Sequence, residues 1–411
     1  MGESIERVVI VGAGHGGVEV AAALRQKGFS GSIHLISDEP DLPYQRPPLS
    51  KEYIKRPGNA LMLKPAQFYT DNRIDLLLGE RATAIDPKAK KVVLEGGETL
   101  AYDHLVLATG ARNRKPPVPG LDHHDVIELR TLADANKIVG VIGGWKHVCV
   151  IGGGFIGLEA AGLLATMGVK VDVVEMAQRL MQRAVSPTVS AWFLDYHAAQ
   201  GTRVHLGTQV RAVEHGAGHA IVHLDDGGPI EADAVVLAAG VVPNTELAAA
   251  AWLKVENGIV VDELLVTSDA AISAVGDCAF YPSRSLPGMA RLESVQNATD
   301  QGKAVAARMM GEPKPYDALP WFWSIQGEAR LQIAGLSKQG LPEVVRGDPA
   351  SGKFSVFLYE GERLAAVESV NAPGEHMAAR RLIAAGTKVA PSVAADTSID
   401  MKSLIEPAQP S

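Results

Sequence analysis

The feature that most constrains this chain is a glycine-rich pattern that occurs twice. Residues 8–38 and residues 148–175 each contain a β-branched run, a glycine-rich turn, an Ala/Leu-rich stretch and a second β-branched run that ends in an acid. This order of segments predicts a βαβ unit at each place. The sequence therefore predicts an α/β fold with two Rossmann-like domains.

Both turns follow the GxGxxG spacing that is typical of dinucleotide sites. Glycine suits these positions because the turn is tight, the backbone touches a pyrophosphate and the helix packs close to the strand. Bare N–H groups and the positive end of the helix then hold the phosphates. The glycines are Gly12, Gly14 and Gly17 in the first copy and Gly152, Gly154 and Gly157 in the second.

An acid follows each glycine turn at the end of the second predicted strand. These acids are Asp38 in the first copy and Glu175 in the second. A carboxylate there accepts hydrogen bonds from a ribose 2′-hydroxyl and repels a 2′-phosphate. A single glycine motif is a weak signal, but two motifs in full βαβ context, each with its acid, predict two bound dinucleotides.

Length, charge and cysteine spacing exclude several classes of protein. The 411 residues are enough for about three domains, and a formal net charge of −8 argues against broad binding of nucleic acid. Cys149 and Cys278 form no CxxC or metal-ligand spacing. No run of eighteen apolar residues and no signal sequence is present. We therefore expect a cytoplasmic protein that makes no use of a membrane.

The histidines do not predict a metal site. His215, His219 and His223 are spaced by four, but the glycines around them and the alternating IVHL segment indicate a β-hairpin. Steps of four residues along a strand span about 13 Å, which is too far for one ion. His123 and His124 lie in a linker rich in Pro and Gly, where we expect them to be solvated.

Further segments extend the pattern over nearly the whole chain. They are PYQRPPLSK (43–51), LATGARNR (107–114), ELRTLADA (128–135), VIGGGFIGLEAA (150–161), AAGVVPNTELA (238–248), AVGDCA (274–279), LESVQNA (292–298) and PWFW (320–323). Together with the first glycine motif, they resemble the FAD- and NADH-dependent ferredoxin reductases of bacterial cytochrome P450 and ring-hydroxylating oxygenase systems. Related disulfide reductases carry a redox cysteine pair, which this chain lacks.

The resemblance implies a glutathione-reductase-like fold with a C-terminal mixed α/β domain. It implies an FAD-binding domain made of two separate segments, with the NADH-binding domain inserted between them. By this resemblance the FAD-binding domain would occupy residues 1–115 and 242–319 and the NADH-binding domain residues 116–241, and ordinary linker signals near these boundaries agree. The C-terminal domain would then occupy residues 320–411.

The resemblance also implies the cofactor-binding residues. The first glycine turn would hold the FAD pyrophosphate, Asp38 the adenosine ribose and Asp277 a ribityl hydroxyl. The remaining phosphate and isoalloxazine regions would be surrounded by Arg46, Lys51, Arg130, the backbone near Val295, and Trp321. Arg46 and Arg130 could instead be solvated charges, and Trp321 could be a core tryptophan. The NADH site would comprise Gly152, Gly154, Gly157, Glu159 and Glu175.

Lys51 and Glu159 are the predicted catalytic residues. A glutamate on an apolar helix face costs several kcal/mol unless it is paired, and the resemblance pairs Glu159 with Lys51 beside the reactive edge of the flavin. Lys51 would favour negative charge on the reduced flavin, and Glu159 would hold the lysine and shape the NADH pocket. The alternative is an exposed helix glutamate. Glu19 occupies the equivalent place in the first copy and has no such assigned role.

The predicted activity is electron transfer from NADH through FAD to a [2Fe-2S] ferredoxin. NADH gives two electrons as hydride and a ferredoxin takes one at a time, so the flavin must divide the pair. The alternatives are an NADH-dependent rubredoxin, quinone, oxygen or monodehydroascorbate reductase, or a flavoprotein like apoptosis-inducing factor.

Docking of an acidic ferredoxin onto this acidic chain would be transient and would need a local positive face. The candidates are either Lys303, Arg308 and Lys314, or Arg380 and Arg381 on the last predicted helix. Any one of them could instead be an ordinary solvated charge. The family often has Asp after PWFWS, where this chain has Ile325. The identity of the partner is therefore the least specified element of the prediction.

Overall fold

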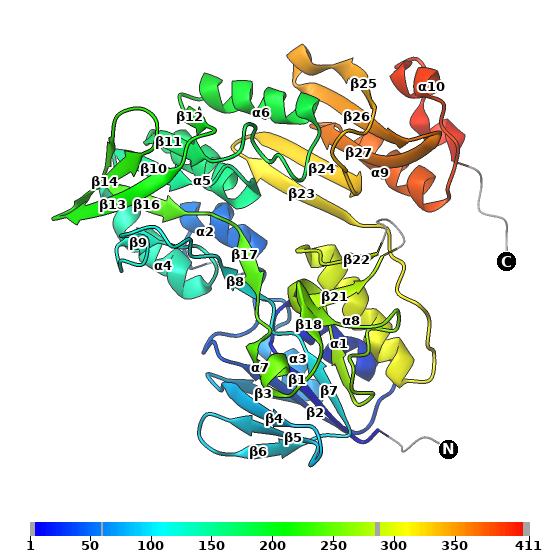
Figure 1. Cartoon of the computed structure of the whole chain (residues 1–411). Coiled ribbons are helices and arrows are strands. Elements are labelled where there is room, and N and C mark those ends of the chain that lie inside the picture. Colours follow the sequence, from blue (N-terminus) through cyan, green and yellow to red (C-terminus); the bar gives the residue numbers. More distant parts are fainter. Residues whose placement is uncertain (1–4, 59–60, 284–287, 406–411) are drawn as a thin grey trace. The chain divides into compact units, whose positions relative to one another are not determined.

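The computed structural model describes residues 5–58, 61–283 and 288–405, which form two compact units (Figure 1). The first unit comprises Met1–Arg46, Asn59–Arg112 and Val241–Ala318, and the second comprises Pro47–Gly58, Asn113–Gly240 and Leu319–Ser411. The second unit thus combines most of the predicted NADH range with the predicted C-terminal range. It also includes Pro47–Gly58, from the range predicted for FAD.

The first unit is built around a five-stranded parallel sheet with β1 at its centre. The strands lie in the order β20-β7-β1-β2-β3, and each neighbouring pair is parallel. Val8, Val9 and Ile10 on β1 are fully buried, as is usual when both faces of a parallel sheet are covered. The strands are β1 (Arg7–Val11), β2 (Ser32–Ser37), β3 (Ile74–Leu78), β7 (His104–Leu107) and β20 (Ile272–Ala274).

Helices α1 and α8 of the first unit pack against each other. The helices of this unit are α1 (His15–Gln26), α3 (Ala66–Asp71), α7 (Glu246–Ala250), α8 (Val295–Met309) and the short η3 (Gly276–Cys278). Its smaller sheets contain β4 (Ala82–Asp86), β5 (Lys91–Leu94) and β6 (Thr99–Ala101); β18 (Val255–Glu256), β19 (Gly258–Val260), β21 (Ala279–Pro282) and β22 (Met289–Ala290); and the pair β8 (Ala111–Asn113) and β17 (Val241–Pro243).

The second unit repeats the same sheet around β10. Its order is β12-β11-β10-β16-β9, again with parallel neighbours. One edge strand differs between the two sheets. Among the five strands of its own sheet, β20 comes last in chain order, whereas β9 comes first in the other sheet. The strands are β9 (Val126–Ile127), β10 (His147–Ile151), β11 (Lys170–Glu175), β12 (Arg203–Leu206) and β16 (Ala234–Leu237).

Two of the helices around this sheet of the second unit begin at N-capping residues that are typical of helix starts. Thr131 and Asp134 form a capping box at α4, and Ser186 caps α6 ahead of a proline. Helix α5 is apolar on all sides and is buried, with Glu159 as its one charged residue. The elements are η1 (Pro47–Ser50), α2 (Glu52–Lys55), α4 (Leu132–Val141), η2 (Ile142–Gly144), α5 (Phe155–Thr166) and α6 (Pro187–Ala199).

The C-terminal region of the second unit is an antiparallel sheet with helices. Its strand order is β23-β24-β27-β26-β25. Helix α9 packs on β24 and β27, and α5 packs on β23 (Figure 1). The elements are β23 (Trp321–Gln326), β24 (Ala329–Gly335), β25 (Glu343–Asp348), η4 (Pro349–Ser351), β26 (Lys353–Glu360), β27 (Arg363–Val370), α9 (Pro373–Ala384), α10 (Pro391–Ala395) and η5 (Met401–Leu404).

The structure confirms the predicted fold class, with two Rossmann-like sheets and a C-terminal α/β region. The predicted hairpin is also present: β13 (Val210–Gly216) pairs antiparallel with β14 (His219–Leu224), which pairs with β15 (Ile230–Ala232). Within the described residues, no helix is long and apolar enough to cross a membrane. The three predicted domain boundaries themselves stay a prediction.

Candidate functional site

The first glycine turn joins β1 to α1 and leaves no room for larger residues at two of its three glycines. Gly12 has a φ of +107°, and a Cβ there would lie 2.2 Å from the carbonyl oxygen of Ala108. A Cβ on Gly17 would lie 1.9 Å from the carbonyl oxygen of Gly12. A Cβ on Gly14 would meet no atom within 4 Å. The turn therefore fits a pyrophosphate, which needs close approach to bare backbone.

The second glycine turn, between β10 and α5, has the same geometry. Gly152 has a φ of +114°, and its Cβ would lie 2.3 Å from the carbonyl oxygen of Ala238. A Cβ on Gly157 would lie 2.0 Å from the carbonyl oxygen of Gly152, whereas a Cβ on Gly154 would meet no atom within 4 Å. Gly14 and Gly154 precede their helices without a side-chain cap, so the first helical N–H groups suit a phosphate. We call these two turns the first and the second cradle.

Glu175 is held beside the second cradle by two backbone amides. Its Oε2 accepts a hydrogen bond of 2.6 Å from the N–H of Gly153, and its Oε1 accepts one of 2.7 Å from the N–H of Ala177. The carboxylate is thereby fixed at the end of β11, next to the turn. This is the position in which a ribose hydroxyl would meet it.

Asp38 differs from Glu175 in its place and in its partners. Val11 on β1 pairs with Ile36, and Ile151 on β10 pairs with Val174. Ser37 is therefore the residue equivalent to Glu175, and Asp38 lies one position further along. Its carboxylate is 3.2 Å from a guanidinium nitrogen of Arg81, and the side chain is 56% exposed.

The other predicted FAD residues of the first unit lie on loops and helix ends. Arg46 is partly buried and pairs with Glu39, with an N–O distance of 2.5 Å, so it is not a solvated charge. Asp277 lies in η3, directly after β20. Val295 is the first residue of α8, which Ser294 caps by accepting a hydrogen bond from the N–H of Asn297. The backbone near Val295 is thus a helix N-terminus, whose N–H groups suit an oxygen of a ligand.

The second unit brings Lys51 and Glu159 together. Nζ of Lys51 lies 2.7 Å from Oε2 of Glu159, and the glutamate is buried, with 6% of its surface exposed. The same oxygen accepts a hydrogen bond of 2.7 Å from the hydroxyl of Ser50. Oε1 accepts bonds of 2.8 Å from the hydroxyl of Ser324 and 3.3 Å from the N–H of Ile325. The predicted pair therefore exists within one unit, inside a larger set of donors.

The sequence analysis missed Ser50 and Ser324 as partners of Glu159. Neither serine belongs to a spacing that predicts a contact with α5, and they lie 109 and 165 positions from the glutamate. The structure also shows what Ile325, which stands where the family often has Asp, contributes to this site. This residue reaches Glu159 through its backbone N–H, which any side chain other than proline leaves in place.

Arg130 and Trp321 also belong to the second unit. Arg130 precedes α4, and its backbone N–H donates to a carboxylate oxygen of Asp134. Trp321 begins β23 and is partly buried; its ring centroid lies 4.0 Å from the guanidinium carbon of Arg380 and 5.7 Å from the ring of Trp323. Their roles at the flavin stay predictions.

Two of the candidate docking cations are engaged elsewhere. A guanidinium nitrogen of Arg308 donates to the hydroxyl of Ser273 at 2.6 Å and lies 3.1 Å from Nε2 of His104. Burial lowers the pKa of Arg308, and it is a poor candidate for a docking surface. Arg380 lies over Trp321. The exposed candidates are Lys303, Lys314 and Arg381.

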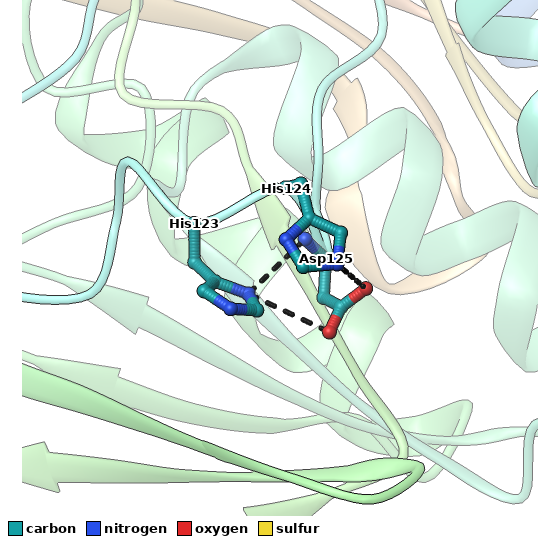
Figure 2. A group of neighbouring side chains, drawn as sticks. All are labelled: His123, His124 and Asp125. Atoms are coloured by element: carbon teal, nitrogen blue, oxygen red, sulfur yellow. Dashed lines mark hydrogen bonds and ion pairs between the residues drawn. The ribbon is translucent and has the colours of Figure 1, made fainter.

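His123, His124 and Asp125 bring three possible metal-ligand atoms within 4.8 Å of one another (Figure 2). The carboxylate of Asp125 lies 3.5 Å from Nδ1 of His123 and 3.4 Å from Nε2 of His124. Nδ1 of His123 already accepts a hydrogen bond from the N–H of Asp125, and the side chain of His124 is 81% exposed. We therefore do not assign a metal to this group.

Two family models and several known proteins are similar to the chain. Residues 6–302 match the pyridine nucleotide-disulphide oxidoreductase model, and residues 321–405 match the reductase C-terminal model. Rhodocoxin reductase from Rhodococcus erythropolis is 48% identical over 398 residues, which is 96% of this chain and 93% of that protein.

Two solved structures are similar over almost their full length. The ferredoxin reductase for the CYP199A2 system of Rhodopseudomonas palustris is 46% identical, with a TM-score of 0.95 over 97% of this chain and 100% of that chain. A chain of the covalent putidaredoxin reductase–putidaredoxin complex is 39% identical, with a TM-score of 0.93 over 98% of this chain and 99% of that chain.

Proposed function

The chain belongs to the pyridine nucleotide-disulphide oxidoreductase family, and on that premise we propose that it is a flavoprotein reductase that passes electrons from NADH through FAD to a ferredoxin. The observation that carries this proposal is the presence of two cradles in a chain whose cysteines, Cys149 and Cys278, are both free and buried. With no dithiol to receive them, the electrons leave for an external carrier. The ferredoxin would in turn supply a cytochrome P450 or a dioxygenase, since similar reductases are named for the CYP199A2 system and for an anthranilate 1,2-dioxygenase system.

The first cradle is the proposed FAD site. Gly12, Gly14 and Gly17 would lie against the pyrophosphate, and the helix end at Val295 would add N–H groups. Asp38, Arg46 and Asp277 are assigned to FAD by resemblance, as are Lys51, Arg130 and Trp321. When bound, FAD supplies the chemistry of accepting two electrons and releasing them singly.

The second cradle is the proposed NADH site. Gly152, Gly154 and Gly157 would lie against the pyrophosphate of NADH, and Glu175 would accept hydrogen bonds from its adenosine ribose. Because both oxygens of Glu175 are held by backbone amides, the carboxylate cannot easily turn away from a ligand. A 2′-phosphate would meet this fixed negative charge, which favours NADH over NADPH.

Lys51 and Glu159 are the proposed catalytic residues. Glu159 accepts four hydrogen bonds and is thereby kept in one orientation. It holds Nζ of Lys51 at 2.7 Å, so that the ammonium charge is placed before the reaction begins. Such a preorganised charge stabilises negative charge that develops during reduction.

The proposed partner is a [2Fe-2S] ferredoxin that docks transiently through electrostatic contacts. The net charge of −8 means that attraction to an acidic carrier must come from a local positive face. The exposed candidates for that face are Lys303 and Lys314 in the first unit or, as an alternative, Arg381 in the second unit. If they steer docking, reduction of the ferredoxin will slow as ionic strength rises.

The test is to purify the protein with its flavin and to follow reduction by NADH and by NADPH in a stopped-flow instrument. A panel of [2Fe-2S] ferredoxins, rubredoxins, quinones and ferricyanide then serves as acceptors. We expect fast reduction by NADH and fast reoxidation by at least one ferredoxin. Colourless folded protein would contradict the FAD assignment, and fast transfer only to rubredoxin or quinone would contradict the ferredoxin assignment.

A further inference from the structure

Ser324 connects the carboxylate of Glu159 to polar side chains that the proposed mechanism does not use. The hydroxyl of Ser324 lies 2.8 Å from Oε1 of Glu159 and 3.3 Å from Nε2 of Gln326. Oε1 of Gln326 lies 2.8 Å from Nε2 of His197 on α6. Three elements, α6, β23 and α5, therefore contribute to one continuous set of hydrogen bonds.

The hydrogen bonds in this set all point toward the glutamate. An ionised carboxylate only accepts, so the hydroxyl of Ser324 must donate to Glu159. The oxygen of Ser324 then accepts from the side-chain amide of Gln326, whose own oxygen accepts from Nε2–H of His197. Hydrogen bonds that run in one direction polarise one another and strengthen the last bond.

The side chains of this set are buried, and burial strengthens the hydrogen bonds between them. The side chains of Ser324, Gln326 and His197 are fully buried. Burial also lowers the pKa of His197, although its hydrogen bond to Gln326 opposes this, so the imidazole is neutral and donates through Nε2. Water does not compete for these groups, and electrostatic interactions are stronger there than at the surface.

Close packing fixes the positions of the elements that carry these side chains. A Cβ on Gly162 of α5 would lie 2.5 Å from the backbone nitrogen of Gly327, at the turn between β23 and β24. The hydroxyl of Tyr196 on α6 accepts a hydrogen bond of 2.9 Å from the N–H of Glu328, at the same turn. The turn is thus held from both helices, and Ser324 has little freedom to move away from Glu159.

We propose that Ser324, Gln326 and His197 are positioning residues that orient Glu159 and, through it, Lys51 for the reaction with NADH. This inference rests on the proposed function, because the role of Lys51 at the flavin does. The hydroxyl of Ser50 performs the corresponding task at the other carboxylate oxygen. The C-terminal sheet would then contribute to the reaction without itself touching NADH.

The test compares Ser324→Ala with Ser324→Thr and with a matched control, Ser355→Ala. Ser355 is a fully buried serine of the same sheet, and its hydroxyl bonds to Ser369. The first readout is the flavin midpoint potential, titrated with a dye so that neither NADH nor ferredoxin is needed. The second is the limiting rate of flavin reduction by NADH, determined separately from the NADH dissociation constant.

In Ser324→Ala we expect a more negative potential, because Lys51 is held less firmly and favours the reduced flavin less. We also expect the limiting reduction rate to fall about tenfold, as for the loss of one hydrogen bond to a charged group. Ser324→Thr keeps a hydroxyl and should recover most of the rate. Ser355→Ala should keep the wild-type potential and rate, even if its melting temperature falls.

A wild-type potential and rate in Ser324→Ala would overturn the inference. If Ser324→Ala does not fold, Gln326→Met serves instead, because it removes the amide and keeps the volume. A smaller change in the same direction is expected for it, and none at all would likewise overturn the inference. Wild-type protein that binds FAD but is not reduced by NADH would instead contradict the proposed function.

Discussion

The two helices that follow the two cradles carry a glutamate at the same position, but the two glutamates have different surroundings. Glu19 on α1 is partly exposed, and its carboxylate lies 3.9 Å from Nζ of Lys303, an exposed residue of α8. Glu159 on α5 is buried and accepts four hydrogen bonds. Helix α1 packs against α8, whereas α5 packs against β23 and η1. The glycine motif determines the turn, and the packing partner determines what the glutamate can do.

The acids after the two cradles differ in the same way. Glu175 is held by the N–H groups of Gly153 and Ala177. Asp38 lies one residue beyond the equivalent position and faces Arg81 near solvent. Equivalent glycines thus do not imply equivalent acids, and substitutions made in parallel in the two copies can separate the shared features from the distinct ones.

The largest effects are expected from Gly12→Ala and Gly152→Ala. Each alanine needs a strained positive φ and meets a carbonyl oxygen at 2.2 or 2.3 Å. Gly12→Ala should purify without FAD or fail to fold. Gly152→Ala should keep its flavin absorbance, but the rate of flavin reduction by NADH should fall about 100-fold, because a 1 Å misplacement of a bound substrate can have that effect.

Gly140→Ala is the control, since a Cβ there has no neighbour within 4 Å. Flavin absorbance after gel filtration and stopped-flow reduction measure the outcome for all three variants. Loss of FAD from Gly152→Ala, with FAD retained by Gly12→Ala, would reverse the assignment of the two cradles.

The next effect is expected from Glu159→Gln compared with Glu19→Gln. The first change removes the charge that holds Lys51 and should slow flavin reduction by NADH by about 100-fold, as for the loss of a preorganised electrostatic partner. The second change should leave the rate within about twofold, because a surface ion pair contributes little. Stopped-flow reduction measures both. Equal rates in the two variants would show that burial and the four donors confer no role on Glu159.

A smaller effect is expected from Glu175→Ala compared with Asp38→Ala. Loss of the fixed carboxylate should shift the NADH-to-NADPH ratio of kcat/KM by about 10- to 100-fold toward NADPH, the size of a hydrogen bond to a charged group. Asp38→Ala should leave this ratio unchanged. Steady-state kinetics with both coenzymes tests the pair, and an unchanged preference in Glu175→Ala would remove its assignment.

The smallest effect concerns the pH dependence of stability in the second unit. Glu368 on β27 accepts hydrogen bonds from the N–H and hydroxyl of Ser186 at the start of α6. Burial raises the pKa of Glu368 from 4.5 to about 7, although the bonds from Ser186 oppose the shift. The folded protein therefore binds a proton on the carboxylate of Glu368 more tightly than the unfolded chain does.

The stability that this proton contributes is present below pH 4.5 and is lost as the pH rises to about 7. In this window the free energy of unfolding should fall by at most about 1.4 kcal/mol per pH unit, the limit for one proton. Glu368→Gln should remove that dependence in urea titrations across the window. A variant with the wild-type slope would contradict it.

The sequence predicted the cradles well because their geometry is local. A positive φ, a backbone contact and a helix start require glycine at fixed spacing, whatever surrounds the turn. The resemblance also paired Lys51 with Glu159 correctly, although no spacing rule connects a loop residue to a helix so far along the chain.

The two βαβ units, and the turn at each cradle, were determined by the sequence alone, because β-branched runs and obligatory glycines act over a few residues. Only the tertiary structure decided that Glu159 is buried among Ser50, Lys51 and Ser324 while Glu19 remains near solvent. The physical reason is that a carboxylate's role depends on which donors surround it. Here those donors come from segments 109 and 165 positions away, brought together by the packing of α5 against η1 and β23.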